Sequence, residues 1–404
     1  MLFKIVRKGL PFIQRVQRLS TPHSSSFGGE GDSVKELLRG ASSPDERIFS
    51  ENQEPFLSNT YVDSGRKDNS IDESKSRKPY EEDHSHNSSI LFPGQGMQYP
   101  GMGSILFDKE KEVPIIGSLF DRASHLLNYD LKKLCLEASQ EELDKTVHCQ
   151  PATFVSSLAS VEYLYSTSPD SVRNCISTAG FSVGELAALV FSGAISFEDG
   201  VRLVKVRAEE MQRCSEIEES GMMTVFYGAN NEVGLALKVA QKWLKEKHDI
   251  KKPVVTIANY LYSQSKVIAG HKKALDFIDA NKEDFKIRKT KRIPVSGAFH
   301  TTLMQDALPL FKEQLAQTQI HVPKIPVFAN IDGQIYSSPN DIRKKLPKQI
   351  ISPVKWEQTI NSMYKYTNPE HIPSVIECGP GKSLSYILRK INGKIARKAS
   401  NVSV

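Results

Sequence analysis

The sequence predicts a protein of the α/β class, in which a large domain with a mostly parallel sheet carries a smaller inserted unit. From residue 89 onward, short apolar runs alternate with segments whose apolar residues recur at helical spacing, which is typical of a parallel sheet covered by helices. Within 217–291 this alternation gives way to two helical patterns among four strand-like runs. We therefore expect a large domain formed by 89–216 and 292–395, interrupted by the unit at 217–291.

The inserted unit is expected to follow the order strand, helix, strand, strand, helix, strand, which is that of a ferredoxin-like βαββαβ unit. Its strand-like runs cover 222–227, 254–258, 265–269 and 285–293, and its helical patterns begin at Val233 and Ala274. An insertion of this kind forms a cleft with its host domain, where ligands bind preferentially. The large domain then resumes with strand-like runs at 327–330 and 375–378, separated by a hairpin signal at Asp332-Gly333.

The composition excludes several classes of protein. With 404 residues, of which 39% are apolar and 25% charged, the chain can form about two or three ordinary globular domains. Its five cysteines show neither CxxC nor zinc-finger spacing, which argues against a disulfide framework and predicts a reducing compartment. No run reaches the length of about 18 consecutive apolar residues that a membrane span needs, so no membrane span is expected.

Residues 1–29 differ from the rest of the chain. Five Lys and Arg side chains lie among apolar residues, Ser and Thr follow, and no acid appears before Glu30. This composition is typical of a mitochondrial transit peptide, whereas a secretory signal has a longer apolar core. We expect 1–29 to direct the protein to the mitochondrial matrix; a basic tail is the alternative. Without these five charges the net charge of +6 falls to about +1, so the basicity does not indicate nucleic-acid binding.

The next segment, 30–88, is rich in Ser, Asp, Glu, Lys and Asn. Such a composition cannot bury enough apolar surface to fold, so we expect a polar and mostly disordered linker. Residues 34–38 are the exception, since Val-Lys-Glu-Leu-Leu can form one or two helical turns.

The hexapeptide Gly180-Phe181-Ser182-Val183-Gly184-Glu185 has the form of a nucleophile elbow. It lies between a strand-like run at 176–179 and a helix-forming run at 186–191, which is the context that such an elbow needs. The two glycines leave room for a sharp turn, and the start of the following helix offers N–H groups to a developing oxyanion. We therefore predict that Ser182 is a nucleophile. An ordinary Gly/Ser turn is the alternative, because GxSxG alone is only moderately specific.

Five further motifs accompany the elbow. They are Ile-Leu-Phe-Pro-Gly-Gln-Gly-Met-Gln at 90–98, Val-Arg-Ala-Glu-Glu-Met-Gln at 206–212, Pro-Val-Ser-Gly-Ala-Phe-His at 294–300, Gln-Ile-Ile-Ser-Pro-Val-Lys-Trp at 349–356 and Glu-Cys-Gly-Pro-Gly at 377–381. In this order and spacing the motifs resemble the malonyl-CoA:acyl carrier protein transacylases over roughly 89–395. Phe181 stands where bacterial members usually carry histidine and is most similar to the mitochondrial branch. The resemblance implies an α/β-hydrolase-like large domain.

His300, which ends the 294–300 motif, is the predicted general base. An imidazole with a pKa of about 6.5 can take the serine proton during attack and return it to a leaving thiol. No Asp or Glu lies in a motif that resembles a triad acid. The resemblance implies instead that the backbone carbonyl of Gln349 orients the His300 ring, and that the main-chain N–H groups of Gln95 and Val183 form the oxyanion hole.

Arg207 follows Ser182 by 25 residues, at the place of the family's arginine. The resemblance implies that its two parallel N–H donors bind the free carboxylate of a malonyl group, although a helix-surface charge is an equal alternative from the sequence alone. Phe299 resembles the bulky residue that excludes an α-methyl group from such sites. Gln150 and Asn259 match polar positions of the family.

The resemblance implies transfer of malonyl from malonyl-CoA to the phosphopantetheine thiol of an acyl carrier protein, for mitochondrial fatty acid synthesis. We expect a monomer that needs no metal and no cofactor. The basic residues Lys286, Arg288, Lys289, Lys291 and Arg292 are expected to meet coenzyme A phosphates, an acidic carrier protein or only solvent. A serine hydrolase or thioesterase that acts on acyl-CoA is one alternative, and a non-enzymatic acyl-carrier binding module is another.

The amino-terminal segment can be tested by itself. We expect a reporter fused to residues 1–40 to enter mitochondria and to lose its basic segment, because that segment has the charge pattern of a transit peptide. Fluorescence microscopy and mass analysis of the purified reporter measure both results. A reporter that stays in the cytosol would favour the basic-tail alternative.

Overall fold

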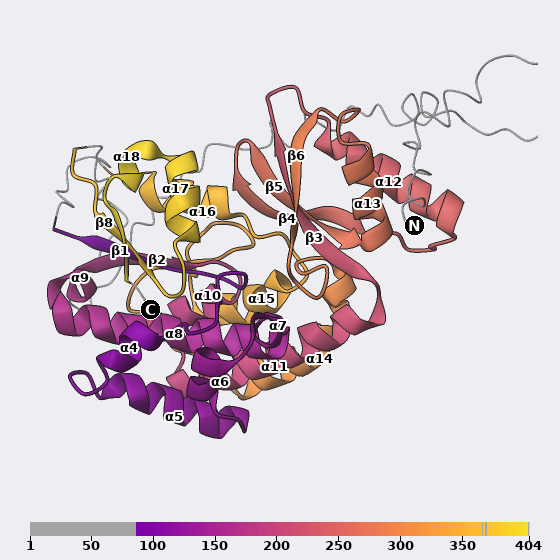
Figure 1. Cartoon of the computed structure of the whole chain (residues 1–404). Coiled ribbons are helices and arrows are strands. Elements are labelled where there is room, and N and C mark those ends of the chain that lie inside the picture. The colour runs from indigo at the N-terminus through magenta and orange to yellow at the C-terminus, as the bar shows by residue number, and fades with distance from the viewer. Residues whose placement is uncertain (1–85, 366, 368–369, 403) are drawn as a thin grey trace, which may run out of the picture.

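The computed structural model describes residues 86–404 except 366, 368–369 and 403. The predicted transit peptide and residues 30–85 of the predicted linker therefore lie outside the described residues. The described chain forms two units, each built around its own sheet (Figure 1).

The large unit contains a five-stranded parallel sheet. Its strands are β1 (Ser88–Phe92), β2 (Cys175–Gly180), β7 (Val327–Phe328), β8 (Ser374–Cys378) and β9 (Ala399–Val402), in the order β7-β2-β1-β8-β9. All neighbouring strands pair in parallel. Alternate residues point to opposite faces of the sheet, and both faces are covered, so β1, β2, β7 and β8 are almost completely buried, whereas the edge strand β9 is partly exposed.

The two faces of this sheet belong to two apolar clusters. The helices of the unit are α4 (Ser104–Asp108), α5 (Ile115–Leu127), α6 (Leu131–Glu137), α7 (Gln140–Asp144), α8 (Thr146–Thr167), α9 (Pro169–Arg173), α10 (Gly184–Phe191), α11 (Phe197–Ile217), η2 (Thr302–Ala307), α14 (Leu308–Gln317), α15 (Pro339–Gln349), α16 (Trp356–Tyr364), α17 (Ser383–Ile391) and α18 (Gly393–Ala396). Ile90 and Phe92 of β1 pack with residues of α8 and α10. Leu91, between them, packs with residues of α16 and α17 on the other face.

Helix α11 begins with a well-formed cap. The side chain of Ser196 accepts a hydrogen bond from the Asp199 N–H group, and two acids in the first turn complement the helix dipole. The helix then packs against α5, α8 and α14 in the lower part of the molecule (Figure 1). This packing carries Arg207, near the middle of α11, into the interior.

The second unit is an antiparallel sheet with two helices on one face. The strands are β3 (Ser220–Tyr227), β4 (Val255–Tyr262), β5 (Ser265–His271) and β6 (Ile287–Ile293), in the order β4-β5-β3-β6, and the helices are α12 (Val233–His248) and α13 (Lys272–Ala280). The sequence of elements is therefore βαββαβ. This unit and the parallel sheet together confirm the predicted α/β fold with a ferredoxin-like insertion.

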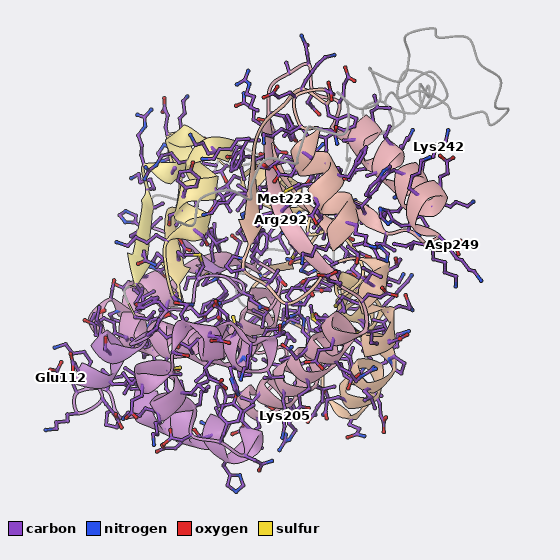
Figure 2. The ribbon with its side chains drawn as sticks, turned by 45° about the vertical axis from the view of Figure 1, so that its right-hand side comes forward. Glu112, Lys205, Met223, Lys242, Asp249 and Arg292 are labelled. Atoms are coloured by element: carbon purple, nitrogen blue, oxygen red, sulfur yellow. The ribbon has the colours of Figure 1, made fainter. Side chains whose placement is uncertain are left out.

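The second sheet contributes to two cores at once. On β3, Met223 and Val225 pack in the cluster that contains α12 and α13, whereas Met222 joins the core of the large unit. Figure 2 labels Met223 of β3 and Arg292, its partner on the edge strand β6, close to each other, while Lys242 marks the outer helix α12. The alternation of side chains along a strand thus lets one sheet serve both units.

Some boundaries differ from the predicted ones. Strand β1 begins at Ser88, inside the predicted linker, and β9 lies beyond the predicted end at 395. Strand β6 begins at Ile287, two residues after the start of the predicted run at 285–293, and ends at Ile293 as that run predicts. The run predicted as a strand at 327–330 pairs only at Val327 and Phe328, because Ala329 turns back through hydrogen bonds with Gly333 and Gln334.

Two predictions from composition can be compared with the structure. All five cysteines are free and buried, which confirms that they form no disulfide framework. None of the helices in the described part of the chain combines the length and the apolar character that crossing a bilayer requires.

Candidate active site

The elbow connects β2 to α10 as the sequence predicts. Ser182 occupies the left-handed region with φ 55°, which side-chain-bearing residues rarely adopt. A Cβ atom at Gly180 would lie 1.9 Å from the carbonyl carbon of Gly184, and one at Gly184 would lie 2.4 Å from the carbonyl oxygen of Phe92. Both glycines are therefore required by the close approach of backbone to backbone.

The loop after β1 lies directly against this elbow. The N–H group of Phe181 donates to the Phe92 carbonyl at 2.9 Å, and a Cβ at Gly94 would lie 2.7 Å from the Phe181 carbonyl oxygen. Gln95 follows in the same loop. No described group accepts from the backbone N–H of Gln95 or from that of Val183. Both groups are thus available to an oxygen that carries developing charge.

His300 lies beside the serine on the loop between β6 and η2. Its Nε2 is 2.8 Å from Ser182 Oγ, and its Nδ1 is 2.7 Å from the backbone carbonyl oxygen of Gln349. A carbonyl oxygen can only accept, so Nδ1 carries the hydrogen and Nε2 is left to accept the serine proton. Burial, followed by the nearby Arg207 cation, lowers the pKa of His300 to about 4, which keeps the ring neutral at physiological pH.

Arg207 reaches the same point from α11. Its guanidinium donates to Gln150 Oε1 at 2.6 Å, to Gln349 Oε1 at 2.9 Å and to Ser182 Oγ at 3.0 Å. The side chain is 1% exposed, and no described carboxylate forms an ion pair with it. Burial lowers the pKa of Arg207 to about 10, against a smaller opposing effect of Glu185, so the group stays charged. A buried cation that meets only neutral acceptors is suited to an anionic ligand.

Glu185 is an acid that is buried next to the site, which the sequence alone does not indicate. Its carboxylate accepts from Tyr336 Oη at 2.7 Å, from the Asn330 N–H group at 3.1 Å and from Gln349 Nε2 at 2.8 Å. The pKa of Glu185 rises to about 7 through burial, although these three hydrogen bonds and Arg207 act in the opposite direction. The available signal was an acid in the first turn of an otherwise apolar helix.

Asn330 was also missed. It follows β7, is fully buried, and its side chain contacts both Ser182 and Gly180 of the elbow. An amide at the carboxyl end of a predicted strand was the only signal in the sequence, because the elbow lies about 150 positions away along the chain.

The other predicted residues lie in different settings. Phe299, which precedes His300, is buried in the core of the large unit. Gln150 Nε2 approaches Gln95 Oε1 at 3.4 Å, whereas Asn259 lies on β4 and its Oδ1 has no partner among the described groups. The described residues contain no cluster of three His, Cys, Asp or Glu side chains that could hold a metal.

The basic run lies outside this site, along and just before the edge strand β6. Lys286 pairs with Glu232, and Arg292 pairs with Asp276. Lys286 and Arg288 also line a surface hollow of about 300 Å³ together with residues 228–230. Charged side chains on an edge strand protect it from pairing with another chain, which is sufficient to explain this run.

A buried serine on an elbow, hydrogen-bonded to a histidine and to an arginine, defines a site for acyl chemistry through a serine. The acyl transferase domain family matches residues 90–378, which is more than half of the chain. The chain therefore belongs to the acyl transferase domain family.

The similar proteins within this family are named as malonyl transacylases. A mouse protein named malonyl-CoA-acyl carrier protein transacylase, mitochondrial, is 45% identical over 317 residues, which cover 78% of this chain and 82% of the relative. The crystal structure of the malonyl-CoA:acyl carrier protein transacylase of Xanthomonas oryzae pv. oryzae matches with a TM-score of 0.69 and 30% identity, over 79% of this chain and 95% of that one. A further match is a chain of the structure described as a type II PKS acyl-carrier protein in complex with its malonyl-transacylase. The TM-score is 0.66 and the identity 30%, over 79% of this chain and 96% of that one.

The elbow gives a prediction about stability. We expect Gly180→Ala to lower the free energy of unfolding by about 3 kcal/mol, because the added methyl group overlaps the backbone of Gly184. Gly393→Ala is the control: nothing lies within 4 Å of a Cβ there, so we expect a change below about 0.5 kcal/mol. Urea denaturation of both variants measures the difference. Equal stability of the two variants would contradict the steric argument.

Proposed function

We propose that this protein transfers malonyl from malonyl-CoA to the phosphopantetheine thiol of an acyl carrier protein through an ester on Ser182. The observation that carries this function is the buried Arg207 guanidinium, which lies 3.0 Å from Ser182 Oγ and has no carboxylate partner among the described residues. A malonyl group bound as an ester at Ser182 supplies such a carboxylate. The names of the relatives support the same substrate and the mitochondrial location.

The first half-reaction forms the acyl-enzyme. His300 Nε2 accepts the Ser182 hydroxyl proton while Oγ attacks the thioester carbonyl, and the N–H groups of Gln95 and Val183 stabilise the oxyanion. The C–S bond then breaks, and the imidazolium returns the proton to the coenzyme A thiolate. In the second half-reaction His300 accepts the proton of the carrier-protein thiol while the sulfur attacks the ester carbonyl. The C–O bond to Ser182 then breaks, and the imidazolium returns the proton to Oγ, which restores Ser182.

A backbone carbonyl in place of a triad acid affects how the base works. The Gln349 carbonyl fixes the tautomer of His300, but it stabilises the imidazolium less than a carboxylate would. We infer that His300 is a weaker base than the histidine of a full triad. A weaker base activates water less, which suits an acyl-enzyme that must persist until the carrier protein arrives. A thioesterase would instead release the acyl group to water, and a binding module would need neither the Ser182–His300 pair nor Arg207.

The finer parts of the proposal concern partners and processing. The solved complex of a related transacylase with its acyl carrier protein supports a carrier protein as acceptor. We propose a monomer of the mitochondrial matrix that serves fatty acid synthesis, with a transit peptide over 1–29 and a polar linker over 30–88. We further propose that Phe299 limits the size of the acyl group, and that 217–291 form a subdomain beside the catalytic segments 89–216 and 292–395.

The nucleophile and its base give one prediction. We expect Ser182→Ala to abolish the malonyl adduct and His300→Ala to slow its formation by several orders of magnitude, because the two side chains act as a unit. Intact-mass spectrometry after mixing with malonyl-CoA measures the adduct. Near-normal acylation of Ser182→Ala would rule out this serine, and rapid release of malonate by the parent protein would favour a thioesterase.

Arg207 gives a prediction about selectivity. We expect Arg207→Ala to weaken malonyl transfer by roughly 2–5 kcal/mol of transition-state binding, the scale for losing one partner of a buried charged pair. Acetyl transfer should be unchanged or faster, because an acetyl group has no carboxylate. Arg207→Lys should recover part of the malonyl activity, since it keeps the charge without the planar fork. Initial rates with both acyl-CoA substrates test this, and equal loss of both activities would assign Arg207 a structural role.

A further inference from the structure

Asn330 is a fully buried amide that takes no part in the reaction steps above. Its Oδ1 accepts from the N–H group of Ser182 at 2.7 Å, and its Nδ2 donates to the carbonyl oxygen of Gly180 at 2.7 Å. A single side chain therefore bridges the nucleophile and Gly180, two residues before it. Few side chains can do this, because the bridge needs one acceptor and one donor on the same rigid plane.

The backbone of Ser182 needs such a support. Ser182 has φ 55°, and a residue with a side chain in this left-handed region is strained and persists only where the surroundings hold it. Without Asn330, the buried N–H of Ser182 would also lose its acceptor. The carbonyl group of Ser182 is held separately, because it accepts from Gln349 Nε2 at 2.7 Å.

Asn330 itself is fixed from both sides by its own main chain. Its N–H group donates to Glu185 Oε1 at 3.1 Å, and its carbonyl oxygen accepts from the N–H group of Lys355 at 2.8 Å. These bonds anchor the residue to α10, which starts at the elbow, and to the segment before α16. The backbone of Asn330 is therefore held in place, and its side-chain amide can keep Ser182 in a fixed position.

We infer that Asn330 is a positioning residue that holds Ser182 in the conformation that places Oγ 2.8 Å from His300 Nε2. The inference rests on the proposed function only in that Ser182 is the nucleophile. Asn330 acts on the serine and not on the acyl group, so its loss slows malonyl and acetyl transfer by the same factor. This equality distinguishes its role from that of Arg207.

Asn330→Asp tests the bridge with almost no change of shape. The new carboxylate still accepts from the Ser182 N–H group, but its second oxygen faces the Gly180 carbonyl, and two acceptors repel each other. At about pH 8 we expect acylation to be roughly 100-fold slower than in the parent, the cost of a small misplacement of reacting groups. The measurement is the rate of adduct formation with malonyl-CoA, acetyl-CoA and p-nitrophenyl acetate.

The same variant should recover as the pH falls. A protonated carboxyl group donates to the Gly180 carbonyl and restores both hydrogen bonds, so the rate relative to the parent should rise between about pH 8 and about pH 5. The titratable groups in hydrogen-bond contact with this cluster are Glu185, Tyr336, Arg207 and His300. Dividing each rate by that of the parent at the same pH removes their common contribution.

Asn281→Asp is the matched control. Asn281 is also a buried amide whose Nδ2 donates to a backbone carbonyl, that of Phe277, at 2.7 Å, but it lies in the second unit. We expect this variant to lose stability without a change in acylation rate and without recovery at low pH. Thermal unfolding of both variants separates loss of fold from loss of positioning.

Several outcomes would overturn the inference. They are a normal rate for Asn330→Asp at about pH 8, a loss that does not recover on acidification, or unequal losses for malonyl and acetyl. Asn330→Ala should be slow at every pH, and failure of both variants to fold would show that the residue serves the fold and not the serine. A parent protein that reacts with p-nitrophenyl acetate but not with malonyl-CoA would refute the proposed function, while the comparison of variants would still decide the role of Asn330.

Discussion

The left-handed backbone of Ser182 is the constraint on which the site depends. The sharp turn that it forms requires glycine at 180 and 184, because a Cβ atom at 180 would overlap the backbone of Gly184 and one at 184 would overlap the carbonyl group of Phe92. It also explains why two motifs far apart in the sequence occur together, since the loop that contains Gln95 packs directly on the elbow. His300 has a left-handed backbone too, with φ 61°, so both members of the reacting pair are held by their surroundings and not by local preference.

The site also organises charge inside the protein. Arg207 and Glu185 are both buried, and the side-chain amide of Gln349 lies between them, accepting from the first and donating to the second. The pKa values, about 10 for the arginine and about 7 for the acid, leave the cation charged at neutral pH while the acid can take up a proton. A carboxylate that enters beside Arg207 therefore meets a cation without a direct competitor, and the neutral His300 remains able to accept a proton.

Local patterns in the sequence predicted the fold and the serine, because alternating runs and a glycine-flanked turn are local features. They did not predict Glu185 or Asn330. The roles of these residues arise from hydrogen bonds between α10, the end of β7 and α15, which meet only after folding. Resemblance to a family supplied what spacing could not, namely the carbonyl of Gln349 as a partner for His300. The sequence predicted the turn at Asp332-Gly333 but not that β7 would end at Phe328, because the hydrogen bonds of Ala329 with Gly333 and Gln334 form only in the folded turn.

The second sheet has one face in each core, as the neighbouring residues Met222 and Met223 show. Exchange of this insertion between related enzymes would therefore transplant half of an interface, leaving residues such as Val267 and Ala269 against a foreign surface. A chimaera needs compensating changes in the host as well as the donor segment. Natural variation in the insertion faces the same restriction: the exposed faces of its outer helices are free to change, while the inner face of β3 and β5 must change together with the enzyme that carries it.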